Sequence, residues 1–195
     1  MKKGYNKYIA LGAAILVILW MVLSYNSMVN RDAAVNNSWA DIQALYQRRM
    51  DLIPNLVSTV KGYANFEKST LTDVINARAK ATQVTIDPSH ITPQQMQQFE
   101  AAQGALTSSL SRLMVTVERY PNLKADQNFM ALQAQLEGTE NRISFGRQNF
   151  NKTVKEYDVY IGHFPRNILA RLFGFQYKPY FQADQAASSV PQVKF

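Results

Sequence analysis

The apolar residues of this chain form one continuous run followed by stripes at helical spacing. The run covers residues 9–23 (IALGAAILVILWMVL), fifteen uncharged positions with no counterpart elsewhere in the sequence. From Val35 onward the apolar positions recur at steps of three, four or seven, without strand-like alternation. Steps of three and four place side chains on one face of a helix. The pattern therefore predicts an all-α protein.

The first stripe predicts a very long helix. It runs from Val35 to Arg78, and no turn-forming pair separates it from the apolar run. We expect the chain to stay helical from the run to about Gln83. Pro54 removes one backbone hydrogen bond inside this stretch. Because the stripe resumes in phase at Leu56, we expect a kink at Pro54 and no chain reversal.

Two further helices and a short one follow the turn-forming segment 84–92. Thr92 and Gln95 have the spacing of a capping box, with Pro93 suited to the first turn. Gly174 is placed to terminate the short helix. The expected elements are a helix that ends at Tyr120-Pro121, a stripe over 129–161, a short helix over 166–173 and an irregular tail from 178.

These elements predict an N-terminal single transmembrane helix that continues into an antiparallel bundle of three to four long helices. We divide the chain into a short basic N-terminus (1–7), a transmembrane helix (8–25), a soluble helical bundle domain (26–177) and an irregular C-terminal tail (178–195).

The apolar run has the length and the flanks of a retained membrane anchor. Eighteen helical residues, 8–25, extend about 27 Å, close to the thickness of a hydrocarbon core. A cleaved signal peptide is the alternative, but the residues after the run offer no Ala-x-Ala-like cleavage site. Aromatic rings favour the headgroup layer, and both ends of the span carry them: Tyr5, Tyr8, Trp20 and Tyr25.

Basic residues around the span predict its orientation. Lys2, Lys3 and Lys7 precede it, whereas Arg31 alone follows it closely. Cytoplasmic flanks carry the excess of Lys and Arg. We therefore expect a cytoplasmic N-terminus and a helical domain on the periplasmic or extracellular side.

Charge and composition argue against nucleic-acid binding, metal binding and catalysis. The net charge is +7, but the charges are interspersed along the helices, so nucleic acid is not an expected partner. The chain has no cysteine, and its two histidines, His90 and His163, lie outside any zinc-ligand spacing. No phosphate-binding loop or nucleophile elbow occurs. We expect no catalytic residue, no cofactor and no metal site.

Several charged residues lie close to positions that helix packing would make apolar. A charge in a helix interface is costly unless it is paired, so we expect such residues to find partners across helices. The structural interpretation is a register-fixing ion-pair network, and the alternative is a ligand-binding groove. The candidate network comprises Arg49, Asp51, Arg78, Glu118, Glu140 and Arg147.

Several motifs resemble the LemA family of bacterial membrane proteins. The block at 49–57 (RMDLIPNLV) is the most specific, and the resemblance covers nearly the whole chain. It implies an N-terminal single-span anchor in the bacterial inner (cytoplasmic) membrane and a soluble antiparallel helical domain, without an established enzymatic activity. Some relatives are associated with membrane remodelling or organelle formation in bacteria. The other matching pieces are 61–64 with Glu67, 118–121, Glu140 with Arg147 and Asn151, 164–167 and 191–195.

Two functions are compatible with these features. The first is a membrane-anchored scaffold that self-associates, recruits other membrane or envelope proteins or shapes membrane organisation. The length of the first helix and the small residues Ala10 and Ala14 in the span motivate self-association. The second is a membrane-tethered module that holds a lipid, peptide or small ligand in a helical groove. The aromatic stretch 172–181 is expected to fold back onto the bundle, with a protein or lipid contact as the alternative.

Overall fold

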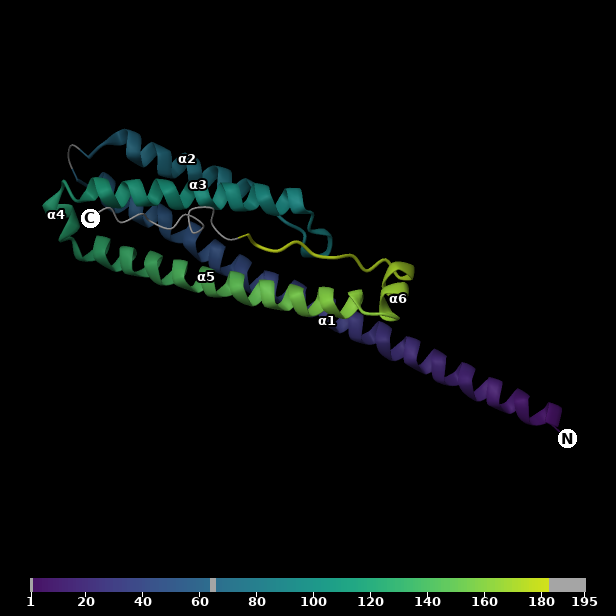
Figure 1. The fold of residues 1–195 in the computed structure, drawn as a ribbon. Coiled ribbons are helices and arrows are strands. Elements are labelled where there is room, and N and C mark those ends of the chain that lie inside the picture. Colours follow the sequence, from purple (N-terminus) through teal and green to yellow (C-terminus); the bar gives the residue numbers. More distant parts are fainter. Residues whose placement is uncertain (1, 64–65, 183–195) are drawn as a thin grey trace, which may run out of the picture.

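The protein is a helical bundle on a long N-terminal stalk (Figure 1). The computed structural model describes the backbone of residues 2–63 and 66–182, and side chains from residue 7 onward. No strand occurs in these ranges, so the all-α fold class is confirmed. The elements are α1 (Lys2–Lys61), α2 (Lys68–Gln83), a 3₁₀ turn η1 (Pro88–His90), α3 (Pro93–Val117), α4 (Pro121–Lys124), α5 (Gln127–Gly162) and α6 (Arg166–Leu172).

Four helices form the bundle, and the chain reverses at each connection. α1 packs along α5, and α2 packs along α3 (Figure 1). Arg49 of α1 pairs with Glu140 of α5, whereas Arg31 reaches Glu156, so these two helices are antiparallel. The close approach of α1 and α5 occurs at Gly146, where a Cβ atom would lie 3.2 Å from a side-chain carbon of Ile42.

α1 passes without interruption from the apolar run into the bundle, as the sequence predicted. Its 60 residues extend about 90 Å, and Pro54 lies inside the helix. The expected end near Gln83 is wrong, because α1 ends at Lys61 and α2 returns alongside it. Gly62 is the signal that periodicity overlooked, since glycine weakens a helix and favours its end. The stripe stays in phase across the break because spacing alone carries no information on chain direction.

The other helix ends follow the sequence closely. Thr92 and Gln95 form the predicted capping box at the start of α3. Gly174 terminates α6 with a φ of 79°, a conformation that favours glycine. The amide of Phe175 then donates to the carbonyl of Ala170, 2.9 Å away, which completes a Schellman motif.

The core is divided into two apolar clusters along the bundle. The membrane-proximal cluster extends along α1 from Met28 to Tyr46, and the distal cluster begins at Met50. The segment 174–182, which we call the C-terminal strap, has no helix or strand but contributes Phe181 to the membrane-proximal cluster. Phe181 is therefore packed in the core, although it follows residue 177, where we expected the irregular tail to begin. Residues 183–195 of the expected tail lie outside the described residues.

Candidate functional site

A buried arginine lies between the two apolar clusters. Arg49 is 2% exposed and comes from α1. Its guanidinium donates to Glu140 on α5 at 2.7 Å and to Thr107 on α3 at 3.1 Å. It also donates to the side-chain oxygen of Gln103, one turn before Thr107. We call these four residues the Arg49 layer. Three helices are therefore held together at one level by one cation.

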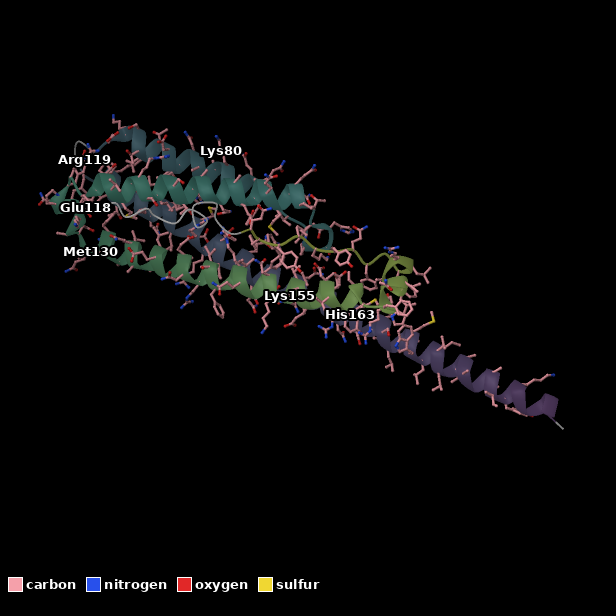
Figure 2. The ribbon with its side chains drawn as sticks, in the orientation of Figure 1. Lys80, Glu118, Arg119, Met130, Lys155 and His163 are labelled. Carbon is pink, nitrogen blue, oxygen red and sulfur yellow. The ribbon has the colours of Figure 1, made fainter. Side chains whose placement is uncertain are left out.

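The six polar residues singled out in the sequence do not form one network. The Nε atom of Arg78 donates to the backbone oxygen of Met50, 3.0 Å away, and so joins α2 to α1. Asp51 is exposed and accepts a hydrogen bond from Gln47 within α1. Glu118 lies at the end of the bundle far from the N-terminus, where it pairs with Lys124 (Figure 2). Asp51 and Glu118 are therefore surface residues.

Arg147 contacts α1 one turn before the Arg49 layer. Its Nε atom donates to the hydroxyl oxygen of Tyr46 at 2.8 Å, and its guanidinium lies 5.3 Å from the ring centre of Phe181. Burial raises the pKa of the Tyr46 hydroxyl, and the positive charge of Arg147 acts in the opposite direction. Arg147 thus links α1 to the C-terminal strap.

Aromatic rings and one amide hold the strap against the bundle. The Phe181 ring stacks on Trp39, with 5.9 Å between ring centres, and meets Phe150 edge-on. The side chain of Asn151 donates to the Phe181 carbonyl and accepts from the Phe181 amide, both at 2.9 Å. These two bonds satisfy the strap backbone as a neighbouring strand would.

A buried lysine anchors the start of the strap. Lys178 has a side chain 7% exposed, which lies 3.0 Å from Asp32 of α1. Its ammonium group also donates to the backbone oxygens of Pro88 and Ser89. Its amide donates to the carboxylate of Asp158 at 3.2 Å. Sequence reasoning missed Lys178, because its partners come from three distant segments and share no spacing with it.

The predicted interface aromatics have different surroundings. Tyr8 is 76% exposed on the isolated part of α1, whereas Trp20 packs against the membrane-proximal cluster. Tyr25 contacts the rings of Phe173 and Phe175. The side chain of Tyr5 lies outside the described residues.

Neither histidine takes part in a metal-like cluster. The ring of His90 pairs with Asp87 at 3.2 Å on the surface, and His163 contacts a backbone oxygen of its own helix (Figure 2 labels His163). Within the part of the chain that the structure describes, no three His, Asp or Glu residues are arranged to hold a metal ion.

The comparison with known proteins identifies the family. The model of the LemA family matches residues 38–195. The chain belongs to the LemA family. Magnetosome protein MamQ 2 of Paramagnetospirillum magneticum is 24% identical over 194 residues, with 91% of this chain and 71% of that protein covered. Protein LemA of Metamycoplasma hominis is 24% identical over 161 residues, with 82% and 69% covered.

The match to the LemA family begins inside α1, after the apolar run. The matched region holds the Arg49 layer and the C-terminal strap. Within the described residues, α1 is the one helix that is long and apolar enough to cross a membrane. Its side chains from Ile9 to Leu19 are exposed, as a lipid-facing surface requires. Together these findings support a membrane-associated helical protein.

Loss of the Glu140 carboxylate in this LemA-family chain is expected to destabilise the bundle. Glu140→Ala leaves the buried Arg49 charge without its anionic partner, which costs about 1.5–3 kcal/mol of unfolding free energy. Glu137→Ala, an exposed neighbour on α5, is the matched control and should change stability by less than about 0.5 kcal/mol. Urea unfolding of the full chain in detergent, followed by circular dichroism, measures both. An equal cost of Glu140→Ala in an Arg49→Met background would contradict the pairing.

Asp158 makes folding stability depend on pH. Burial raises the pKa of its carboxyl above the ordinary value. A raised folded-state pKa means that folding disfavours the ionised form, a cost that is absent below about pH 3.8 and develops as pH rises through the folded-state pKa. The unfolding free energy of Asp158→Asn minus that of the parent chain should therefore increase as the pH rises from 3.5 to 7. Urea unfolding at each pH measures this difference. Asp51→Asn controls for the loss of one surface charge, and a constant or opposite difference for Asp158→Asn would contradict the assignment.

Proposed function

We propose that the protein is a membrane-anchored scaffold, in which one span holds a rigid helical bundle at a set height and orientation for self-association or partner recruitment. The observation that carries this proposal is the continuity of α1. The same helix forms the span and one side of the core, with Met28 and Val35 already fully buried. No linker separates anchor from domain, so the bundle cannot reorient independently of the span.

We place the span in the bacterial inner membrane, with the N-terminus in the cytoplasm and the bundle outside. The charge difference around the span supports this orientation. Arg166 and Arg171 of α6 come to the outer end of the span after folding. The positive-inside rule counts residues that flank a span in the chain, so these two arginines do not enter it.

Homo-oligomers and other envelope proteins are the proposed partners. The bundle leaves large apolar side chains on its outer surface, such as Val115 and Phe145, each 72% exposed. The small residues Ala10 and Ala14 permit close helix contact within the span. The relatives named magnetosome proteins fit a role in assembly, which we extend to this chain only as a proposal.

One observation favours the second function, a tethered binding module. A hollow of about 580 Å³ lies between α1, the segment 89–92 and the strap. Tyr25, Asp32 and Lys178 are among its lining residues, so it offers both apolar and charged groups. Its volume is within the range of small-molecule sites.

Orientation can be tested in a chain that has no native cysteine. A membrane-impermeant maleimide is expected to label Val115→Cys in intact spheroplasts, because Val115 is exposed on α3. Lys3→Cys should be labelled only after lysis and serves as the control for the opposite side. The reverse pattern would show that the bundle faces the cytoplasm.

Self-association can be tested by crosslinking in native membranes and by size measurement in detergent. Ala14→Leu should reduce crosslinked oligomers, because a larger side chain separates helices that meet at Ala10 and Ala14. Leu16→Met, on the opposite face of the span, is the control and should leave them unchanged. A monodisperse monomer that binds one saturable ligand would overturn the scaffold and favour the binding module.

A further inference from the structure

α6 lies against the last turns of the span. Leu169 and Ala170 are buried in the cluster on which Trp20 and Met21 also pack. The Phe173 ring, directly after α6, meets Tyr25 edge-on with 4.9 Å between ring centres. Because Tyr25 ends the predicted span, α6 lies at the level where hydrocarbon gives way to headgroups.

The outer side of α6 is apolar. Ile168 is 58% exposed and Leu172 is 70% exposed, although both are large apolar side chains. They are four residues apart, so they project from one face of the helix, and that face is exposed. Phe164, just before α6, is 80% exposed. Three large apolar groups therefore face outward beside the membrane span.

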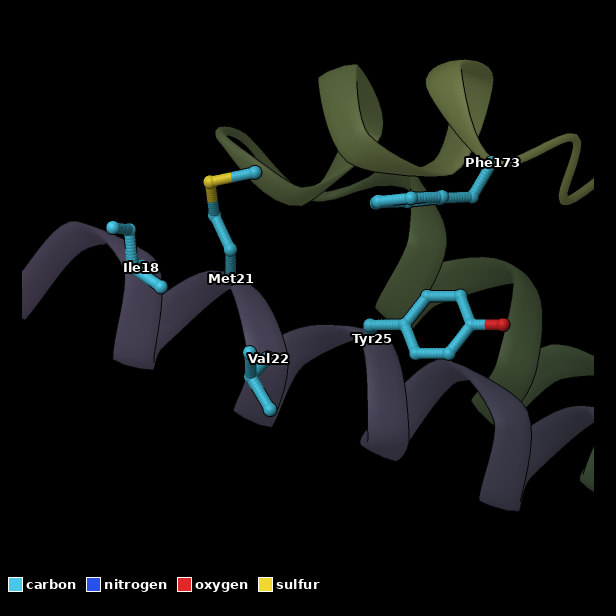
Figure 3. A pocket seen from close by; sticks show the side chains of 5 residues that line it. All are labelled: Ile18, Met21, Val22, Tyr25 and Phe173. Carbon is cyan, nitrogen blue, oxygen red and sulfur yellow. The ribbon is translucent and has the colours of Figure 1, made fainter.

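An apolar slot joins α6 to the span. It has a volume of about 320 Å³ and is lined by five side chains, of which four belong to α1 and one follows α6 (Figure 3). Ile18 and Val22 are both part of the exposed apolar surface of α1 and of this slot. The slot therefore continues the lipid-facing surface of the span, and its apolar lining suits an acyl chain.

The charges around α6 favour anionic headgroups. Arg171 is exposed on α6, and Arg166 and Arg31 lie on the ring of Tyr160 at 4.2 and 4.6 Å. Between residues 159 and 182 the sequence contains no aspartate or glutamate. Basic residues beside a membrane surface are attracted to anionic lipids.

We propose that α6, with Phe164 and Phe173, is a lipid-docking element that inserts into the interface beside the span, with an acyl chain in the slot. The proposal rests on the membrane anchoring proposed above. Helices with one apolar face and flanking cations lie in the plane of the interface in this way. A helix that crosses alone can rotate about its own axis, whereas a second contact off that axis fixes rotation and tilt. The bundle is then held at two points on the membrane.

Nitroxide labels on the full chain test this contact. Single labels at Ile168→Cys and Leu172→Cys are introduced, and the chain is reconstituted in vesicles of phosphatidylcholine and phosphatidylglycerol. Accessibility to oxygen, which concentrates in lipid, is compared with accessibility to an aqueous nickel complex. We expect the oxygen-to-nickel ratio at both positions to exceed the ratio at Phe145→Cys, an exposed control on α5, several-fold. Leu16→Cys in the span is the membrane reference. Because both α6 side chains are exposed, the labels leave the core intact, as circular dichroism can verify.

Each outcome separates the proposals. Aqueous ratios at 168 and 172 with a lipid ratio at 16 would overturn the docking element and leave the anchor standing. An aqueous ratio at 16 as well would overturn the anchor itself. Shielding from both agents with dipolar broadening would show that a second copy covers α6, which also overturns the lipid contact. A weaker lipid signal at 172 in Arg171→Gln, seen only when phosphatidylglycerol is present, would support the electrostatic part.

Discussion

The guanidinium of Arg49 sets the level at which the helices of the bundle meet. Arg49 is 2% exposed and lies between two apolar clusters, and its partners come from α3 and α5. A shift of either helix by one turn would remove some of the partners of the buried guanidinium, and loss of its anionic partner on α5 would be the costlier of the two. Hydrophobic contacts tolerate such a shift far better, because a shift by one turn brings another apolar residue of the same stripe to the same place in the core. The layer therefore acts chiefly on register, and a well-packed apolar replacement could match it in stability.

The C-terminal strap joins the helices in the membrane-proximal half of the bundle, as the Arg49 layer joins them in the middle. At this level Trp39 of α1 contacts Phe99 of α3 and Phe150 of α5, both edge-on. Phe181 stacks on Trp39 and meets Phe150 edge-on, and Lys178 closes the strap against α1 and the segment after α2. Each buried aromatic ring is worth a few kcal/mol, while the amide of Asn151 prevents the strap backbone from being buried unpaired. Arg147 connects the strap to the Arg49 layer through Tyr46. It contacts Phe181 and Tyr46, and the Tyr46 ring lies 5.2 Å from the Arg49 guanidinium.

Spacing predicted the helices and caps, because those depend on neighbours in the chain. The capping box at Thr92 and the termination at Gly174 are local and were found in the sequence. The turn after Lys61 was missed because the apolar stripe has the same phase on both sides of it. The partners of Arg49 and Lys178 depend on how the helices are aligned, which no single-chain pattern encodes. The aromatic content of residues 172–181 did predict that this segment folds back onto the bundle, but the residues that it packs against could not be predicted.

α1 contributes one side of the core and also transmits any movement of the span to the bundle. The Arg49 layer lies 24 residues after Tyr25, or about 36 Å along α1. A small tilt of the span would move the far end of the bundle by many ångströms if α1 were the sole attachment. α6 is packed on α1 beside the apolar run. In the proposed docking, a lateral contact there would resist such tilt most directly, because any tilt toward α6 would drive its apolar face deeper into the headgroups. If α6 docks on lipid as proposed, the arginines beside it would resist the opposite motion by holding anionic lipid. Because α1 is continuous, it would carry that restraint from the membrane to the Arg49 layer without a flexible joint.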